Sequence, residues 1–219
     1  MLTVSDIMRD PEVDAFVRQG NEYLGSMGYT EHGLRHLKVV ADRGRHIMTE
    51  LGFSQREIEL TCIAAYLHDV GNVINRVGHS QSGAILAFHI LNRLGMPLNE
   101  IAIVMGAIGN HDESVGTPVN SVAAALILAD KSDVHRRRVR NQDAATFDIH
   151  DRVNYAVEES HLQVDGKQRT VTMELTIDIK ICPVMEYFEI FLTRMLLCRR
   201  AAEFLQATFG LIINEARLL

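Results

Sequence analysis

The sequence of 219 residues is poor in cysteine and contains no tryptophan. Its three cysteines, Cys62, Cys182 and Cys198, are an odd number without a CxxC spacing, so they favour neither a disulfide framework nor a paired-cysteine metal site. We interpret them as reduced core residues. No uncharged apolar run approaches the roughly 20 residues that a membrane span needs. No charged segment followed by an apolar stretch and a small-residue cleavage site opens the chain. We therefore expect a cytoplasmic protein without membrane association.

An excess of positive charge is also missing. The 28 acidic residues outnumber the 22 lysines and arginines, which gives a net charge of -6. Sequence-independent affinity for a nucleic acid comes mainly from counterions released around Lys and Arg, so we expect no long nucleic acid as a partner. A GxSxG motif is absent as well, which disfavours a serine hydrolase. What the chain does have is ten histidines, seven of which precede Lys131.

The first part of the chain predicts a helical domain. Apolar residues recur at helical spacing from about residue 10 to residue 129. Ser54, with Glu57 three residues later, is a capping box that begins one of these helices. Gly71 ends the same helix, so His68 and Asp69 are expected in the last turn of a buried apolar segment. Further helices are predicted over residues 80–94, 98–108 and 122–129.

The pattern changes to that of strands after about residue 141. Apolar residues alternate with threonine and acidic residues over 171–179, which is the period of a strand. The Asp165-Gly166 pair between the runs 153–164 and 169–181 predicts a β-hairpin. A lone hairpin is marginally stable in water, so we expect it to pack on the helices or to pair with a second subunit in a homodimer.

Pro183 then begins a long apolar terminal helix, which Gly210 interrupts near its end. The predicted fold is mainly α. Residues 1–140 are expected to form a helical metal-binding domain, and residues 141–219 a β-hairpin and a long C-terminal helix packed on the same body.

Histidine and aspartate stand at helix ends or in buried helices in five separate segments. They are His36 in RHLKVVA, the pair His68-Asp69 in AAYLHDVG, His79 in GHSQSG, His111 in GNHDE and Asp130 in LADKSD. A single histidine on an apolar helix is more often a satisfied core residue than a ligand. The joint order of the five segments, and the cost of burying carboxylates without a partner, favour a metal site instead.

The donor types narrow the choice of metal. Imidazole together with carboxylate suits the divalent transition metals Mn, Fe, Co, Ni and Zn, whereas an all-oxygen Mg or Ca site would not need this many nitrogens. We expect two such ions per chain. Asp69 is suited to bridge them, because neighbouring side chains at a helix end can diverge toward two ions.

The order of H, then HD, then a distal D resembles the HD-domain phosphohydrolase superfamily. The matching segments are HLKVVA from His36, HDVG from His68 and ADK around Asp130, and they extend over about residues 30 to 140. The resemblance implies five or more helices around a metal site. It also implies that His36, His68, Asp69 and Asp130 are the metal ligands.

Two further histidines extend the resemblance to the two-metal branch of the superfamily, which includes the HD-GYP phosphodiesterases and ribonuclease Y. In that branch the second ion would be held by Asp69, His79 and His111. Asn72, however, stands where HD-GYP proteins carry a lysine, Asn110 stands where the branch has the first of two histidines, and the GYP signature is missing. These departures favour a small nucleotide-like or phosphorylated metabolite over a cyclic dinucleotide.

Basic residues follow the distal aspartate. Lys131, Arg137 and Arg138, on an expected extension of the helix, are candidates for binding substrate phosphate, because guanidinium groups donate in a planar fork. The alternative is an ordinary solvated basic face. His32 lies one helical turn before the first ligand, and we expect it to contact the substrate. We assign catalytic roles to Asp69, Lys131 and His32.

These residues predict an enzyme that hydrolyses a phosphate monoester or phosphodiester, with a metal-bound hydroxide as nucleophile and no covalent intermediate. Asp112 and Glu113, next to His111, could supply a general acid or orient a ligand imidazole, or could cap the loop. The rival function is a non-catalytic nucleotide-binding sensor that keeps the metal site and signals through the hairpin and last helix. Turnover distinguishes the two, because a sensor would bind nucleotides without releasing phosphate.

Overall fold

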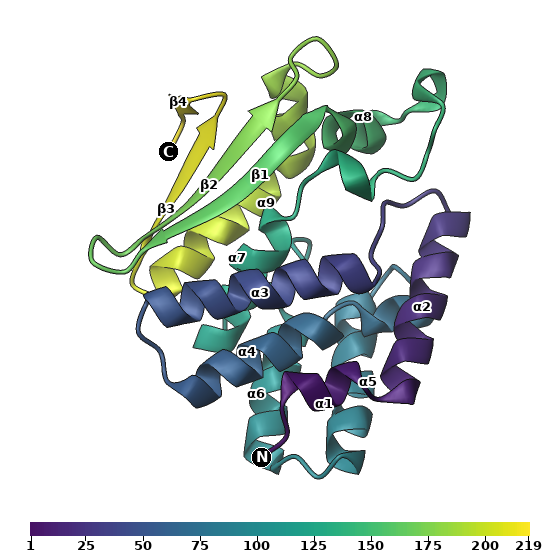
Figure 1. Ribbon diagram of the computed structural model, residues 1–219, viewed down its shortest axis with the longest axis vertical. Coiled ribbons are helices and arrows are strands. Elements are labelled where there is room, and N and C mark those ends of the chain that lie inside the picture. The colour runs from purple at the N-terminus through teal and green to yellow at the C-terminus, as the bar shows by residue number, and fades with distance from the viewer.

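The computed structural model describes residues 1–219 and shows a helical bundle with a small sheet at one end (Figure 1). The α-helices are α1 Val4–Met8, α2 Pro11–Ser26, α3 Leu34–Glu50, α4 Gln55–Leu67, α5 His79–Arg93, α6 Leu98–Gly109, α7 Ser121–Ser132, α8 Ile149–Ala156 and α9 Val184–Phe204. Short 3-10 turns are η1 Val70–Val73, η2 Arg136–Arg138 and η3 Ala144–Thr146. The strands are β1 Val157–Asp165, β2 Thr170–Ile177, β3 Thr208–Ile213 and β4 Ala216–Arg217. The predicted mainly α fold is confirmed.

Local sequence signals explain where several helices begin. The Asp10 carboxylate accepts hydrogen bonds from the backbone of Glu12 and Val13, and Pro11 follows it as the first residue of α2. The predicted capping box of α4 is present, with Ser54 and Glu57 each bonded to the other's backbone N–H. These caps satisfy amide groups that a helix start leaves without partners.

Helix α7 forms the centre of the bundle. Every residue from Val122 to Ser132 is buried, because α7 packs against α3, α4, α6 and α9. Its last turn therefore carries Asp130 and Lys131 into the interior rather than toward solvent. A carboxylate and an ammonium group in such a place require partners.

The sheet is larger than the predicted hairpin. β1 and β2 form that hairpin, although residues 153–156 of the predicted strand belong to α8 instead. β3 then pairs parallel with β2, and β4 pairs antiparallel with β3. Gly210 thus lies within a strand and not at a break in the last helix, which already ends at Phe204. The physical reason is that β2 presents a second edge, which β3 covers after α9 crosses back along the sheet.

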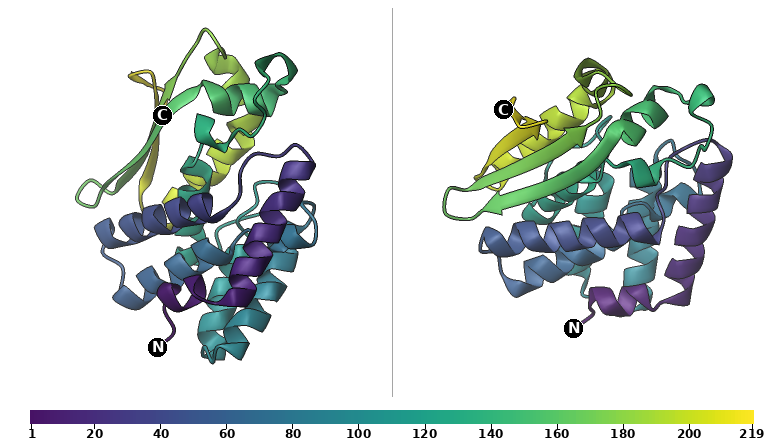
Figure 2. Two further views of the ribbon diagram at one scale, coloured as in Figure 1. Left: turned by 45° about the vertical axis from the view of Figure 1, so that its right-hand side comes forward. Right: turned by 45° about the horizontal axis from the view of Figure 1, so that its top comes forward.

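One face of the sheet packs onto α9 and the bundle (Figure 2). Val171, Met173, Leu175 and Ile177 of β2 all point to this buried side. The hairpin is therefore covered within its own chain, which removes the reason for which a homodimer was expected. One hydrophobic core of 57 buried residues runs through both parts of the chain, so the division near residue 140 stays a prediction.

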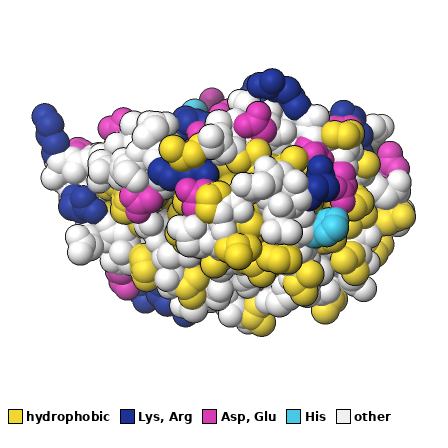
Figure 3. All heavy atoms as spheres, turned by 90° about the horizontal axis from the view of Figure 1, so that it is seen from below, with side chains coloured by type: hydrophobic (Ala, Val, Ile, Leu, Met, Phe, Trp, Pro, Cys, Tyr) yellow, Lys and Arg dark blue, Asp and Glu magenta, His cyan; other side chains and the backbone are white.

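The outer surface is mixed in character. On the end of the bundle remote from the sheet, hydrophobic side chains lie among charged ones of both signs (Figure 3). None of the helices combines the length and the apolar character needed to cross a membrane.

Candidate metal centre and substrate pocket

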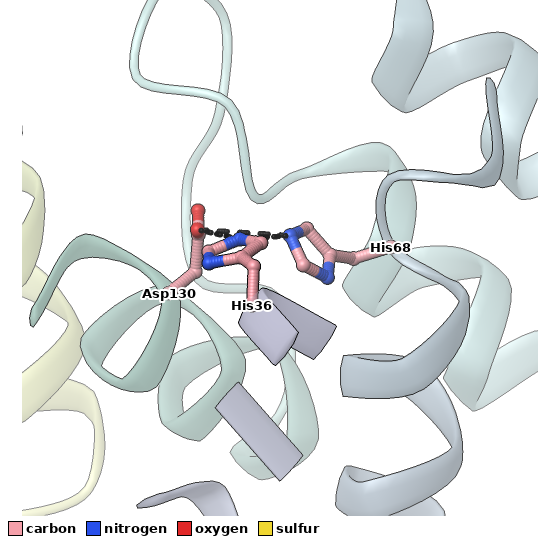
Figure 4. A group of neighbouring side chains, drawn as sticks. All are labelled: His36, His68 and Asp130. Atoms are coloured by element: carbon pink, nitrogen blue, oxygen red, sulfur yellow. Dashed lines mark hydrogen bonds and ion pairs between the residues drawn. The ribbon is translucent and has the colours of Figure 1, made fainter. Parts of the chain in front are cut away.

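The predicted ligands come from five different segments and meet in the interior. They are His36 in the first turn of α3, His68 and Asp69 after the end of α4, His79 at the start of α5, His111 after α6 and Asp130 near the end of α7. All of these side chains are buried. Figure 4 shows His36 on α3, His68 just after α4 and Asp130 on α7 pointing toward one another.

The first group of donor atoms is compact. His36 Nε2 lies 3.3 Å from His68 Nε2 and 3.3 Å from Asp130 Oδ1. His68 Nε2 lies 3.3 Å from Asp69 Oδ2. Spacings of this size suit donors that share one ion, because bonds of about 2.0–2.2 Å to nitrogen and oxygen bring adjacent donors to such distances.

A second group is joined to the first through Asp69. Its Oδ1 lies 3.5 Å from His79 Nε2, which in turn lies 3.1 Å from His111 Nε2. The two oxygens of Asp69 thus face different sets of imidazoles, as a bridging carboxylate would. Asp69 Oδ2 is buried without a hydrogen-bond partner, so this site has a polar atom that the protein alone does not satisfy.

The tautomers of the four imidazoles follow from their hydrogen bonds. Each Nδ1–H donates to an oxygen: His36 to Asp133 at 2.7 Å, His68 to the Ala65 carbonyl at 2.7 Å, His79 to the Arg76 carbonyl at 3.0 Å and His111 to the Ile108 carbonyl at 2.6 Å. In the neutral rings every Nε2 therefore carries a lone pair directed at the centre. Lone pairs this close repel unless a cation lies among them, so the donor set fits a metal.

The charges of the buried carboxylates also favour a cation at this site. Burial raises the pKa of Asp69 and of Asp130, but the cationic groups around them outweigh burial and hold both pKa values well below the ordinary range. Burial lowers the pKa of His68, yet the two carboxylates raise it to about 10. The two carboxylates thus favour a positive charge at this place, which a bound metal cation would supply instead of the proton on His68.

Gly71 explains how the HDVG segment lies against α5. A Cβ at Gly71 would fall 2.0 Å from the His79 carbonyl oxygen and 2.6 Å from the Gly83 nitrogen. Both are backbone atoms that cannot move aside independently. The glycine lets the turn that carries Asp69 approach the start of α5, which brings His79 into the site.

A pocket opens from the candidate metal centre. A small cavity of about 20 Å³ is lined by Asp69, His79, His111, Asp130 and Lys131, together with four residues that also line a larger cavity of about 480 Å³. The four shared residues are His32, Arg76, Arg138 and Arg194. A cavity of about 660 Å³ at the hairpin tip contains none of the predicted site residues. The volume of the adjoining pocket is in the range of small-molecule sites.

Comparison with known proteins assigns the family. The family model of the HD domain matches residues 33–188, which is more than half of the chain. The chain belongs to the HD-domain family. This family comprises metal-dependent phosphohydrolases, in agreement with the resemblance of the sequence.

Two individual proteins are similar to this HD-domain chain. An uncharacterized protein of Methanocaldococcus jannaschii is 24% identical over 194 residues, which are 78% of this chain and 74% of that protein. A crystal structure of a predicted HD superfamily hydrolase from an uncultured Thermotogales bacterium has 24% identity and a TM-score of 0.45. The match covers 57% of this chain and 67% of the other.

Asp133 orients the imidazole of the candidate ligand His36, and sequence reasoning did not single this residue out. Asp133 is buried, and its Oδ2 accepts from His36 Nδ1 at 2.7 Å and from Arg35 Nη2 at 3.0 Å. Burial raises the pKa of Asp133, but His36, Arg138 and Arg35 lower it more, so the carboxyl stays ionised. A carboxylate in this position fixes the ring and makes the imidazole a stronger donor.

Lys131 is placed beside the metal ligands and not out in the pocket. Its Nζ lies 2.7 Å from Asp130 Oδ2 and 2.7 Å from Glu113 Oε2. Burial alone would lower the pKa of Lys131. The two carboxylates outweigh burial and raise the pKa above its ordinary value, so Lys131 stays protonated. It leaves Asp130 Oδ1 to face the histidines. Glu113 also binds Arg194 at 2.9 Å, whereas Asp112 accepts from the Ser114 backbone through Oδ1 and has its Oδ2 3.7 Å from His79 Nδ1.

The basic run after α7 divides into different environments. Arg136–Arg138 forms a separate 3-10 turn, so the expected extension of α7 is wrong. Arg138 is buried, donates to the carbonyls of Glu31 and Asp133, and lines both cavities. Arg137 is exposed and lines neither, so the structure does not bring it to the site. The cause is the pairing of the Arg138 backbone with Glu31, which fixes which side chain turns inward.

His32 lies at the pocket but ahead of α3, so it is not one helical turn before His36 on the same helix. Its ring centroid is 5.6 Å from that of His36, and its Nδ1 donates to the Thr30 carbonyl at 2.7 Å. Burial and the charge of Arg138 hold the pKa of His32 well below its ordinary value, so the ring is neutral. Its Nε2 is left free to accept a hydrogen bond.

Sequence reasoning missed two arginines of the pocket wall. Arg194 had a detectable signal, because it interrupts an otherwise apolar stripe of α9 formed by Tyr187, Phe191, Cys198 and Ala201 at heptad spacing. A cation in a buried stripe indicates a partner or a ligand.

Arg76 had no such signal, since it lies in the turn between η1 and α5. Its Nη1 is 3.4 Å from His79 Nε2 and 3.7 Å from Asp69 Oδ1. Only the fold shows that this turn closes over the second group of donors.

Proposed function

We propose that this HD-domain protein hydrolyses a phosphate ester of a small phosphorylated or nucleotide-like molecule. One observation carries the proposal. Four imidazoles that each donate through Nδ1, together with the carboxylates of Asp69 and Asp130, converge at the inner end of a cavity whose wall carries three arginines. A cation site next to guanidinium groups is an arrangement that binds and activates phosphoryl groups.

We infer two places for divalent transition-metal ions. His36, His68, Asp69 and Asp130 would hold the first, and Asp69, His79 and His111 the second. The unsatisfied Oδ2 of Asp69 and the opposed Nε2 atoms support this assignment. An ion bound there would lower the pKa of an attached water and stabilise charge that develops on the phosphoryl oxygens.

The phosphate would lie against the arginines shared by the two cavities. Arg138 and Arg194 are both held by backbone or carboxylate oxygens, so their forks are oriented before a ligand arrives. Arg76 extends the same wall. Pre-organised guanidinium groups lose less side-chain freedom when they bind a phosphate. We therefore replace Arg137 by Arg76 and Arg194 among the proposed phosphate ligands.

His32 and Lys131 would have different roles in the pocket, because one is neutral and the other is protonated. Neutral His32 would accept a hydrogen bond at Nε2 from the attacking water or from the substrate. Lys131 stays protonated between Asp130 and Glu113, so it would neutralise charge without acting as a base. This division gives one acceptor and one fixed cation near the reacting phosphoryl group.

The test is phosphate or diester release from a panel of nucleotides and small phosphate esters after addition of Mn²⁺ or Fe²⁺. We expect turnover by the wild-type chain and its loss in Asp69→Asn, which keeps the shape of the side chain. Asp42→Asn is the matched control, because Asp42 is an exposed residue of α3. Nucleotide binding without any release by the wild type would instead support the sensor.

A further inference from the structure

The larger cavity is electrostatically two-sided. Its inner wall is formed by Arg76, Arg138 and Arg194, next to the metal ligands. Its outer wall is formed by the start of α8, where Asp148, His150, Asp151 and Asn154 line the same space. A ligand that fills this cavity therefore meets guanidinium groups at one end and carboxylates at the other.

The two carboxylates of the outer wall have no cationic partner. Neither Asp148 nor Asp151 forms an ion pair, although the arginines of the inner wall are all held by oxygens of the protein. Asp151 is only 8% exposed, and its carboxylate receives a single amide hydrogen bond, from Asn141 at 3.4 Å. Burial raises the pKa of Asp151 and the neighbouring Asp148 adds to this, whereas the Asn141 hydrogen bond and the nearby His150 lower the pKa by less.

Helix capping does not account for this arrangement. Asp148 caps α8 through Oδ1, which accepts from the Asp151 backbone at 2.7 Å, and its second oxygen is left over. The Asp151 side chain takes no part in the cap. Asn154 is only 6% exposed and donates to the His150 carbonyl, so its Oδ1 is a further acceptor at the cavity without a partner.

We propose that the outer end of the cavity binds an ammonium group, and that the substrate is therefore a phosphate ester of a small amine. The proposal rests on the proposed function for the phosphate end. Asp148, Asp151 and Asn154 offer three acceptors, and an ammonium group has three N–H donors and the opposite charge. Asp148 is exposed, whereas Asp151 is buried, so neutral hydroxyl groups would satisfy the acceptors but leave the buried charge of Asp151 without a cation.

The first test measures binding without turnover. Alkylphosphonates of two to six carbons, each with and without a terminal amine, are titrated calorimetrically into the full chain saturated with Mn²⁺. We expect the amine to tighten binding about tenfold or more at the best chain length, the size of one charge-assisted hydrogen bond. Equal affinities for the amine and its alkyl partner at every length would overturn the proposal.

Substitutions locate the effect. Asp151→Asn keeps the shape of the side chain, and Asp148→Asn also keeps a residue that caps helices well. Each is expected to remove the preference for the amine and to leave the affinity for the plain alkylphosphonate unchanged. Asp143→Asn is the matched control, because Asp143 caps η3 and lies outside the cavity lining. A preference that survives both substitutions would contradict the assignment.

Turnover separates this proposal from the one on which it rests. If no phosphate ester is hydrolysed, the proposed function fails, and calorimetry still decides whether the amine is bound. If esters are hydrolysed but the amine gives no gain in binding, only the present proposal fails. If nucleoside monophosphates bind best and lose affinity in Asp151→Asn, the carboxylates recognise ribose or base donors, which also overturns it.

Discussion

Asp133 offers a test of how the metal centre is built, because it contacts a ligand imidazole without facing the donor cluster itself. In Asp133→Asn the new amide can still accept from His36 Nδ1, so the ring keeps its tautomer and position. The negative charge is lost. Arg138, at 3.9 Å from Asp133 Oδ2, then loses its carboxylate partner, whereas Arg35, at 3.0 Å, keeps its ion pair with Glu31.

The size of the effect follows from these contacts. Removing a carboxylate that supports a ligand histidine typically weakens metal affinity by about 10–100-fold, which corresponds to roughly 1.4–2.7 kcal/mol. Arg138 left without a carboxylate near the site adds repulsion of the metal cation, so we expect the upper part of this range. His36 itself stays in place. The loss is therefore expected in affinity and not in stoichiometry.

The assay is competition for Mn²⁺ or Zn²⁺ against a chelating indicator. Asp42→Asn is the exposed-carboxylate control, on the helix α3 that also carries His36. Unfolding curves of the metal-free proteins establish that the variant is folded. A wild-type affinity in Asp133→Asn would refute the reasoning, because the ion would then be insensitive to the charge behind His36.

Three further outcomes are expected. Arg194→Met should raise KM for a phosphate ester about tenfold or more with a smaller change in kcat, and Arg194→Lys should recover part of the loss; steady-state kinetics decide this, and an unchanged KM would exclude Arg194 from phosphate binding. Gly71→Ala should disrupt the approach of the HDVG turn to His79, which lowers metal content and thermal stability together, and a fully loaded variant would contradict the steric argument. Asp10→Ala should lower the free energy of unfolding by about 2 kcal/mol, because it removes the cap of α2 and the 2.9 Å ion pair with Arg93. The pKa of Asp10 in the folded chain lies below its ordinary value of 3.8, so this contribution is present above that pH and is lost as the pH falls through the folded pKa; urea unfolding should show the wild-type advantage at pH 7 and its disappearance in acid.

Local signals were sufficient for much of the bundle. The capping box at Ser54 and the turn at Asp165 depend on neighbours within a few residues, and both predictions are confirmed. The C-terminal strand was missed, because Phe209 and Leu211 continue the apolar character of α9, and only pairing with the distant β2 makes the segment a strand. A contact between residues far apart in the sequence leaves no local pattern.

The candidate site also has a part that local sequence signals predict and a part that they do not. The candidate ligands could be selected from the sequence because each lies in a short segment with a known order along the chain. The pocket wall was not, since which arginine of the run turns inward depends on the pairing of Arg138 with Glu31 across the fold. Arg76 likewise reaches the second group of donors only because its turn closes over them. Which arginines line the pocket therefore depends on tertiary contacts, which composition and spacing do not reveal.

The central claim is that two ions share Asp69, and the metal-to-protein ratio tests it most directly. Plasma mass spectrometry of the chain loaded with Mn²⁺ should give about two ions per chain for the wild type and about one for His79→Ala. Asp69→Ala should lose both. A wild-type chain that binds about one ion or none, or an Asp69→Ala variant that keeps the wild-type ratio, would contradict the account.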